Sequence, residues 1–247
     1  MTLQFFTESG LEVPAVTTAQ MIEVDRVAVE ETGPNLFQMM ENAGRNLALQ
    51  AIDCFGDGWQ QAHIVVLAGS GGNGGGGICA ARHLANRGAN VTLCLSSPIE
   101  RLKAVTAWQR HIFQATAGQE IPMADLLAMN QPVDLILDAL IGYSLRAAPR
   151  GPALELIEWA NATDAPTLSL DTPSGVDSTT GETPGEYINA DWTMTLALPK
   201  TGLLSSRTGE LFLADIGIPA GAYDWETLQL DYAAPFGDCY RIPLTAR

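Results

Sequence analysis

Two carboxylates, an amide and a hydroxyl stand where apolar runs of this chain end, and these residue types are suited to chemistry. Asn73 follows the apolar run 64–68, Asp138 follows the run 133–137, and Asp171 and Ser174 follow the run 166–170. Oxygen atoms of these kinds are hard ligands that suit a small cation or a polar group such as a ribose. Taken singly, each aspartate could equally be a helix or turn cap. Their joint occurrence favours a binding site.

The segment 69–77 (GSGGNGGGG) holds seven glycines in nine residues and leads into a helical pattern. Glycine lets the backbone approach a ligand closely, and helix N–H groups favour anionic oxygens. The spacing Gly69-x-Gly71-x-x-Gly74 matches a dinucleotide-binding fingerprint, although a tight turn alone could also explain it. Ser96-Ser97-Pro98 stands where a dehydrogenase places its ribose-binding carboxylate, and no lysine follows the glycines. A hydride-transferring dehydrogenase and a nucleoside triphosphatase are therefore disfavoured.

Apolar runs and helical patterns alternate along the chain, which predicts one doubly wound α/β domain. We expect helices at 17–31, 36–52, 78–86, 99–115, 123–129 and 152–161. We expect strands at 64–68, 90–95, 133–137, 166–170 and 192–197, with weaker ones at 211–214 and 227–230. The fold class is a three-layer, Rossmann-like α/β architecture with a mostly parallel sheet and two leading helices. Residues 1–16 are expected to form an irregular arm and 224–247 a C-terminal tail. In such sheets the ligand lies beyond the carboxyl ends of the strands, which would bring the three polar exits together.

The composition narrows the classes of partner. The 247 residues carry a net charge of −15, which disfavours binding to nucleic acid and to anionic membranes. No segment approaches the roughly 18 apolar residues of a membrane helix, and the first residues lack the pattern of a secretory signal. We therefore expect a cytoplasmic protein. The four cysteines show no metal-ligand spacing, so we expect reduced thiols, and we expect structural or surface roles for the three histidines.

Five short motifs follow one another in order. They are MENAG at 40–44, the glycine stretch at 69–77, DALIG at 138–142, DTPSGVD at 171–177 and PKTGL at 199–203. Their order and spacing resemble those of the NAD(P)H-hydrate epimerases, also called the YjeF N-terminal domain family. The similarity runs from about Thr17 to Ile218 and implies an epimerase domain over 17–223, with a Rossmann-like fold that is commonly a homodimer.

The resemblance also implies a reaction and a ligand set. Members of this family interconvert the R and S forms of hydrated NADH or NADPH (NAD(P)HX), a metabolite-repair reaction, with a bound potassium ion. By position, that ion would be held by Asn73, Asp138 and Ser174. The nucleotide substrate would contact Gly72, Asn73, Gly74, Gly75 and Gly76, the loop residues Gly142, Tyr143, Ser144, Leu145, Arg146, Ala147 and Ala148, and Asp171. A separate protein would supply the ATP-dependent dehydratase step that usually accompanies the epimerase.

Asp171 is the residue that we expect to be catalytic. Loss of a hydroxyl next to a ring nitrogen gives an iminium, and a nearby carboxylate can protonate the leaving hydroxyl and deprotonate the incoming water. Arg146 could pair with a phosphate. The family's Asn-Asn-Gly-Gly-Asp-Gly reads Gly-Asn-Gly-Gly-Gly-Gly here, with departures at Gly72 and Gly76. These departures leave an alternative open, in which an impaired member binds a nucleotide-like ligand or a partner protein without catalysis.

Overall fold

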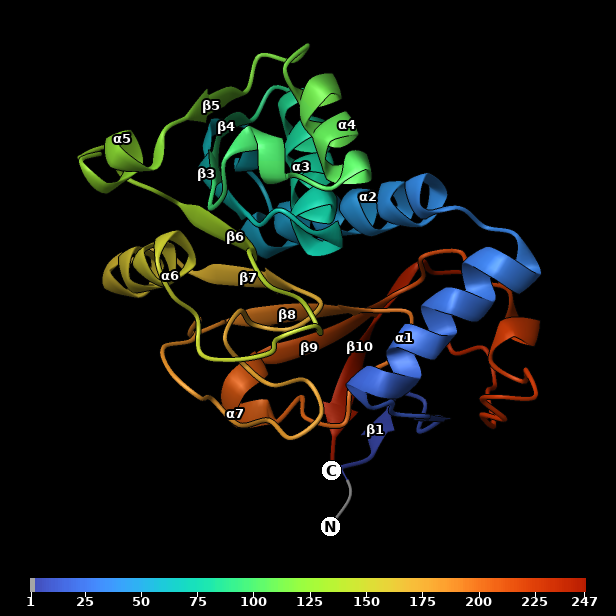
Figure 1. Cartoon of the computed structure of the whole chain (residues 1–247). Coiled ribbons are helices and arrows are strands. Elements are labelled where there is room, and N and C mark those ends of the chain that lie inside the picture. Colours follow the sequence, from blue (N-terminus) through green and yellow to red (C-terminus); the bar gives the residue numbers. More distant parts are fainter. Residues whose placement is uncertain (1–2) are drawn as a thin grey trace.

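A computed structural model describes residues 3–247, and its centre is a ten-stranded sheet (Figure 1). The strand order is β2-β1-β10-β9-β8-β7-β6-β3-β4-β5. The parallel strands are β3 (His63–Ala68), β4 (Asn90–Leu95), β5 (Gln119–Ile121), β6 (Leu135–Ala139), β7 (Thr167–Leu170), β8 (Trp192–Leu196) and β9 (Glu210–Ala214). The antiparallel strands at the other edge are β10 (Arg241–Ala246), β1 (Phe5–Phe6) and β2 (Glu12–Val13). Strands are added toward one edge from β3 to β5 and toward the other edge from β6 to β10, so the strand order reverses between β3 and β6.

Helices cover both faces of the sheet and so make three layers (Figure 1). One face carries α2 (Leu36–Phe55), α3 (Gly72–Ala85) and α4 (Ala104–Phe113), and the other carries α5 (Met123–Leu127) and α6 (Pro152–Ala162). Alternate residues of β3 divide between the two cores: Ile64 and Val66 pack with the first set, whereas Val65 and Leu67 pack with the second. The remaining helices are α1 (Thr18–Val27) and the short α7 (Ser205–Thr208). The expected fold class is confirmed.

The two leading helices begin where the sequence predicts, because each has a capping box. The side chains of Thr17 and Asn35 accept hydrogen bonds from the backbone N–H groups three residues on. In turn, the side-chain oxygens of Gln20 and Gln38 accept from the backbone N–H groups of Thr17 and Asn35. The first helix ends at Val27 and continues as a π-helical segment, Ala28–Thr32, which Gly33 stops with a left-handed φ of 104°.

The glycine stretch differs from the expected loop, since α3 begins at Gly72 rather than at Ile78. From Gly74 to Gly77 the helix carries glycines because neighbouring elements leave no room for side chains. A Cβ at Gly77 would lie 2.4 Å from the Cβ of Ala139 in β6, and one at Gly75 would lie 2.5 Å from Sδ of Met40 in α2. Close packing outweighs the poor helix propensity of glycine here.

Strands occur both in the described part of the expected arm and in the expected tail. The expected irregular arm over 1–16 carries β1 and β2. The expected strand at 227–230 is wrong, because these residues lie in turns and irregular backbone. The last strand is β10, in which Pro243 lies opposite Phe212 of β9. A proline within an apolar run argues against a central strand, which is why the sequence did not reveal it. The expected helix at 99–115 is also shorter, a 3₁₀ turn at Ile99–Arg101 followed by α4.

Within residues 3–247, none of the helices has the length and apolar character needed to cross a membrane.

Candidate active site

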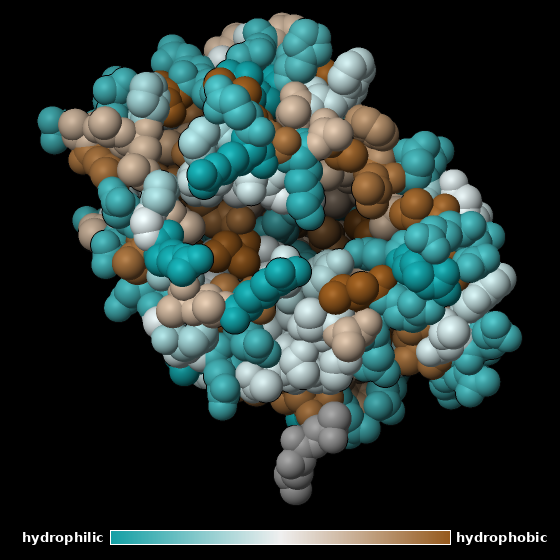
Figure 2. All heavy atoms as spheres, viewed as in Figure 1, coloured by the Kyte–Doolittle hydropathy of each residue, from teal (hydrophilic) through white to brown (hydrophobic). Residues whose placement is uncertain are grey.

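A cleft of about 900 Å³ opens at the carboxyl ends of the parallel strands, where the strand order reverses between β3 and β6. The loops after β3, β4, β6 and β7 line it, and α1 and α2 close one side. Figure 2 shows the hollow near the middle of this face of the molecule. Open α/β sheets bind their ligands at this topological switch point. The loops of the three polar strand exits therefore meet here; Asn73 and Asp171 line the cleft, whereas Asp138 and Ser174 are buried outside its lining.

The first turn of α3 forms part of the cleft wall. Gly71, Gly72, Asn73 and Gly76 line the cleft, so the free N–H groups of this helix end face it. The segment before α4 is tied to the same turn, because the Lys103 backbone N–H donates to Ser70 O at 2.9 Å and Thr106 Oγ1 to Gly71 O at 2.8 Å. This arrangement holds the helix end in place.

Asp138 lies in β6 itself rather than in a loop, and it is fully buried. Its carboxylate accepts from Ser174 Oγ at 2.6 Å, from Ser174 N and Ser169 Oγ at 2.8 Å each, and from Leu140 N at 3.2 Å. Burial raises the pKa of this carboxyl against these hydrogen bonds. Within the described chain, no basic side chain forms an ion pair with it.

Asp171 directly follows β7 with a left-handed φ of 69°, a strained conformation for a non-glycine residue. Its Oδ1 forms an ion pair with Nζ of Lys200, and both side chains are buried. Its Oδ2 accepts from the Tyr143 backbone N–H at 3.2 Å. A Cβ on Gly142 would lie 3.2 Å from Oδ2 of Asp171 and 3.1 Å from Oδ1 of Asn73. The amide and the carboxylate thus face the same space over Gly142.

Comparison with known proteins identifies the family of this chain. A model of the YjeF-related protein N-terminus matches residues 36–202, which is more than half of the chain. The chain belongs to this YjeF-related family. The family matches the resemblance that the motifs indicated, and each of those five motifs contributes at least one residue to the lining of the cleft.

Relatives in this family carry names that describe a repair reaction. An NAD(P)H-hydrate epimerase of Dehalogenimonas lykanthroporepellens is 48% identical over 100% of this chain and 99% of its own length. One from Rhodopirellula baltica is 34% identical over 85% of this chain and 86% of its own. A bifunctional NAD(P)H-hydrate repair enzyme of Hyperthermus butylicus is 38% identical over 84% of this chain, which spans only 39% of that relative.

A solved structure supports the fold of this YjeF-related chain. The crystal structure of a yeast protein superposes with a TM-score of 0.79 over 94% of this chain and 100% of its own. The sequence identity is 23%, so the likeness concerns the fold alone.

Some of the expected substrate contacts lie outside the cleft lining of this YjeF-related protein. Among the expected substrate contacts, the lining includes Gly72, Asn73, Gly76, Gly142, Tyr143, Ser144 and Asp171. Gly74 and Gly75 face away, against Gly69 and Met40. Leu145, Arg146, Ala147 and Ala148 are outside the lining, and Arg146 is exposed. The contacts expected of these six residues stay a prediction.

The prediction from the sequence did not include three basic side chains and one carboxylate that line this cleft. Arg101, Lys103 and Arg150 line it, and none of them forms an ion pair within the described residues. Asp25 of α1 also lines it and accepts a 2.6 Å hydrogen bond from Tyr143 Oη. No local pattern marks Asp25, because its partner lies 118 residues further along the chain.

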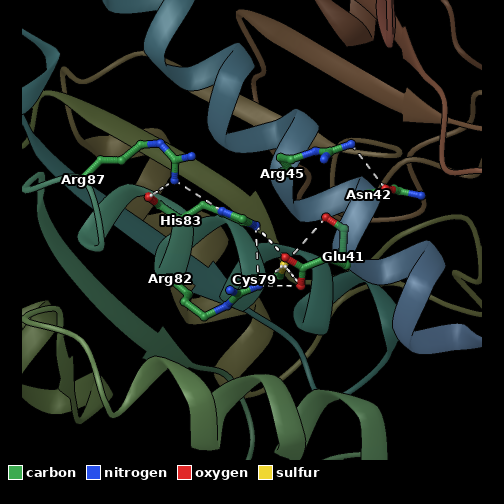
Figure 3. Close-up of polar contacts among 7 residues, drawn as sticks. All are labelled: Glu41, Asn42, Arg45, Cys79, Arg82, His83 and Arg87. Carbon is green, nitrogen blue, oxygen red and sulfur yellow. Dashed lines mark hydrogen bonds and ion pairs between the residues drawn. The ribbon is translucent and has the colours of Figure 1, made fainter.

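A second polar cluster ties α2 to α3 outside the lining of the cleft (Figure 3). Glu41 accepts from Arg82 and lies 2.8 Å from Nε2 of His83, and Arg82 Nη2 is 3.2 Å from Cys79 Sγ. Carboxylate, thiol and imidazole could hold a metal ion, but the Arg82 guanidinium already contacts both the carboxylate and the thiol. Burial raises the pKa of Cys79 to about 12, which keeps the thiol protonated. The cluster therefore acts as an ion pair between helices, and His83 has a carboxylate partner that the sequence did not indicate.

Proposed function

We propose that this protein is an NAD(P)H-hydrate epimerase, an isomerase that interconverts the R and S forms of hydrated NADH and NADPH. The observation that carries the proposal is the Asp171 carboxylate, which faces the cleft while Lys200 holds its other oxygen. The relative from Dehalogenimonas, which has this name, is similar over the whole chain.

The chemistry proposed for Asp171 follows from its two oxygens. The substrate carries a hydroxyl on a carbon next to the ring nitrogen, so the nitrogen lone pair can expel it as water and leave a planar iminium. Water then returns to either face. Oδ1 of Asp171 is engaged by Lys200, whereas Oδ2 faces Gly142 and, within the described part of the chain, accepts only a 3.2 Å hydrogen bond from Tyr143 N. Oδ2 is the atom that would exchange a proton with the hydroxyl or the water.

The cleft offers a positive environment for the phosphates of a dinucleotide. Arg101, Lys103, Arg150 and Lys200 line it, against the carboxylates of Asp25 and Asp171. The N-terminal turn of α3 adds backbone N–H groups. A chain with a net charge of −15 repels anions at long range, so such a local excess of cations supports the binding of an anionic substrate. In this proposal these side chains have the role that the sequence suggested for Arg146.

We propose a potassium ion held by Asn73, Asp138 and Ser174, and the residues fit such an ion. Asp138 is a fully buried carboxylate without a cationic partner in the described chain, and buried charges are ordinarily paired. One amide atom of Asn73, assigned as Nδ2, is buried without a hydrogen-bond partner, and turning the amide over would present an oxygen there. When bound, the ion would supply positive charge that anchors the polar substrate.

The departures at Gly72 and Gly76 leave the proposed catalytic groups in place. A Cβ at Gly72 would meet nothing within 4 Å, and one at Gly76 would meet only Cδ2 of Leu170, at 2.7 Å. Neither glycine alters the contacts of Asp171 with Lys200 and Tyr143. The alternative of an impaired binding module therefore has less support than the epimerase.

Further proposals follow from the family resemblance. A functional link to a separate dehydratase is consistent with relatives that are named bifunctional repair enzymes. We also propose a homodimer that works in the cytoplasm.

The test is a direct assay of epimerisation. Purified R or S hydrate of NADPH is incubated with the protein in potassium buffer, and the ratio of isomers is followed by chromatography against a sample without protein. We expect acceleration by the native chain, its loss in Asp171→Asn, and native rates in Asp125→Asn, which changes an exposed aspartate. No acceleration by the native chain would contradict the proposal, and activity that appears only in Gly76→Asp would establish the impaired alternative. Replacing potassium with sodium tests the ion separately.

A further inference from the structure

A second carboxylate, Asp25, faces the same cleft as Asp171. It belongs to α1, and among residues 3–247 its only hydrogen bond from a side chain is the 2.6 Å bond from Tyr143 Oη to its Oδ2. No basic side chain of the described residues forms an ion pair with it. Its Oδ1 has no partner among the hydrogen bonds of the described chain, so it is available to a ligand in the cleft.

The two carboxylates have different surroundings. Asp171 forms an ion pair with the buried ammonium of Lys200, whereas Asp25 accepts a hydrogen bond from the neutral hydroxyl of Tyr143. Burial raises the pKa of Asp25, and the nearby charge of Asp171 acts in the same direction, while the Tyr143 hydroxyl and the charge of Lys200 oppose it. A pair of carboxyl groups whose environments differ in this way is suited to divide the roles of acid and base between them.

Epimerisation through an iminium needs proton transfer on both faces of a planar ring. The hydroxyl leaves from one face, and the water that inverts the carbon enters from the other. A single carboxylate on one side of the ring reaches only one of these oxygens within hydrogen-bond distance. A second acid–base group on the other side removes this limit.

We propose that Asp25 is the second catalytic acid–base residue of the epimerisation, serving the face of the substrate ring opposite to Asp171. This inference rests on the proposed function. In one direction, the Asp25 carboxyl gives its proton to the hydroxyl oxygen as the C–O bond breaks, and the ring nitrogen lone pair forms the C=N bond. Water then adds to the other face: its electron pair forms the new C–O bond, the C=N π pair returns to the ring nitrogen as its lone pair, and Asp171 takes the released proton. The reverse reaction, or exchange with solvent, restores the two protonation states.

Tyr143 is the positioning residue between the two carboxylates. Its backbone N–H donates to Asp171 Oδ2 and its hydroxyl to Asp25 Oδ2. Its carbonyl is fixed by hydrogen bonds from Ser178 Oγ at 2.8 Å and Thr18 Oγ1 at 3.3 Å. Burial raises the pKa of its hydroxyl, which therefore stays protonated and continues to donate to Asp25. One residue thus sets the separation of the two groups.

The test separates the breaking of the C–O bond from inversion, by exchange of the substrate hydroxyl with ¹⁸O-labelled water. Each purified epimer of hydrated NADPH is incubated with enzyme, and label in both epimers is measured by mass spectrometry after chromatography. Asp25→Asn keeps the shape of the side chain and its acceptor for Tyr143. We expect it to lower epimerisation by about 10²–10⁴-fold, yet to exchange label into one epimer with retention, at a rate within about tenfold of the native one. Asp171→Asn should show the same behaviour with the other epimer.

Two further variants complete the design. Tyr143→Phe keeps the backbone contact with Asp171 and removes the hydroxyl, so we expect a lower kcat with an unchanged KM and the same asymmetry of exchange as in Asp25→Asn. Asp125→Asn is the matched control and should behave as the native protein.

Epimerisation by Asp25→Asn within threefold of the native rate overturns the proposal. So does loss of exchange from both epimers in a variant whose thermal unfolding matches that of the native protein. If the native chain itself is inactive, the proposed function has failed, which is a distinguishable result.

Discussion

Removing the charge of Lys200 should destabilise the fold strongly, because its ammonium is enclosed with one carboxylate. The side chain is fully buried, and its three donors are used by Asp171 Oδ1, by Thr195 Oγ1 at 3.1 Å and by Leu196 O at 2.9 Å. Lys200→Met leaves the Asp171 carboxylate buried with only weak neutral donors. Breaking a buried pair from one side costs about 3–5 kcal/mol, a large share of the roughly 5–15 kcal/mol that stabilises a typical domain.

A double-mutant cycle gives the decisive measurement. Asp171→Asn should cost a similar amount by leaving the ammonium unpaired, whereas the double variant removes both charges. We expect the double variant to cost about as much as either single one, so that the coupling between the two sites is at least about 2 kcal/mol. Urea unfolding followed by the fluorescence of the five tryptophans measures each free energy.

The matched control is Lys103→Met, which removes an exposed lysine and should change the free energy of unfolding by no more than about 0.5 kcal/mol. The reasoning is refuted if Lys200→Met costs less than about 1 kcal/mol, or if the two single effects simply add in the double variant.

Three other predictions concern the glycine helix, the thiols and the basic side chains at the cleft. Gly44→Ala should lower the free energy of unfolding by about 1–3 kcal/mol, because its Cβ would lie 2.4 Å from the Cβ of Cys79. Gly72→Ala, whose Cβ meets nothing within 4 Å, should raise it by up to about 1 kcal/mol, and equal effects in urea unfolding would contradict the packing argument. A thiol reagent at pH 8 should label Cys239 rapidly in the native protein, since this thiol is exposed, while burial raises the pKa of Cys79 to about 12. Rapid labelling that survives Cys239→Ser would disprove this. Arg101→Ala should raise the KM for hydrated NADPH and weaken its dependence on salt with little change in kcat, and an unchanged salt dependence would exclude a phosphate contact.

The fold class and the edge of the sheet that carries the site were predictable from the sequence, whereas the extent of several elements was not. Apolar runs with polar exits at Asn73, Asp138 and Asp171 indicate parallel strands, because such strands are buried on both faces and share one carboxyl edge. Capping residues such as Thr17 fix the start of a helix locally. The strand around Pro243 and the helical state of the glycines depend on neighbours that are distant in the chain.

The sequence alone determined the fold class and predicted polar groups at the strand exits, since periodicity and the residues that follow each apolar run are local properties of the chain. Only the tertiary structure decided which groups share the site. It paired Asp171 with Lys200 and connected Asp25 to Tyr143 across 118 residues. It also brought Arg101 to the cleft and left Arg146 exposed outside its lining. The physical reason is that charge pairing and burial depend on how helices and loops pack against the sheet, and no local pattern records that packing.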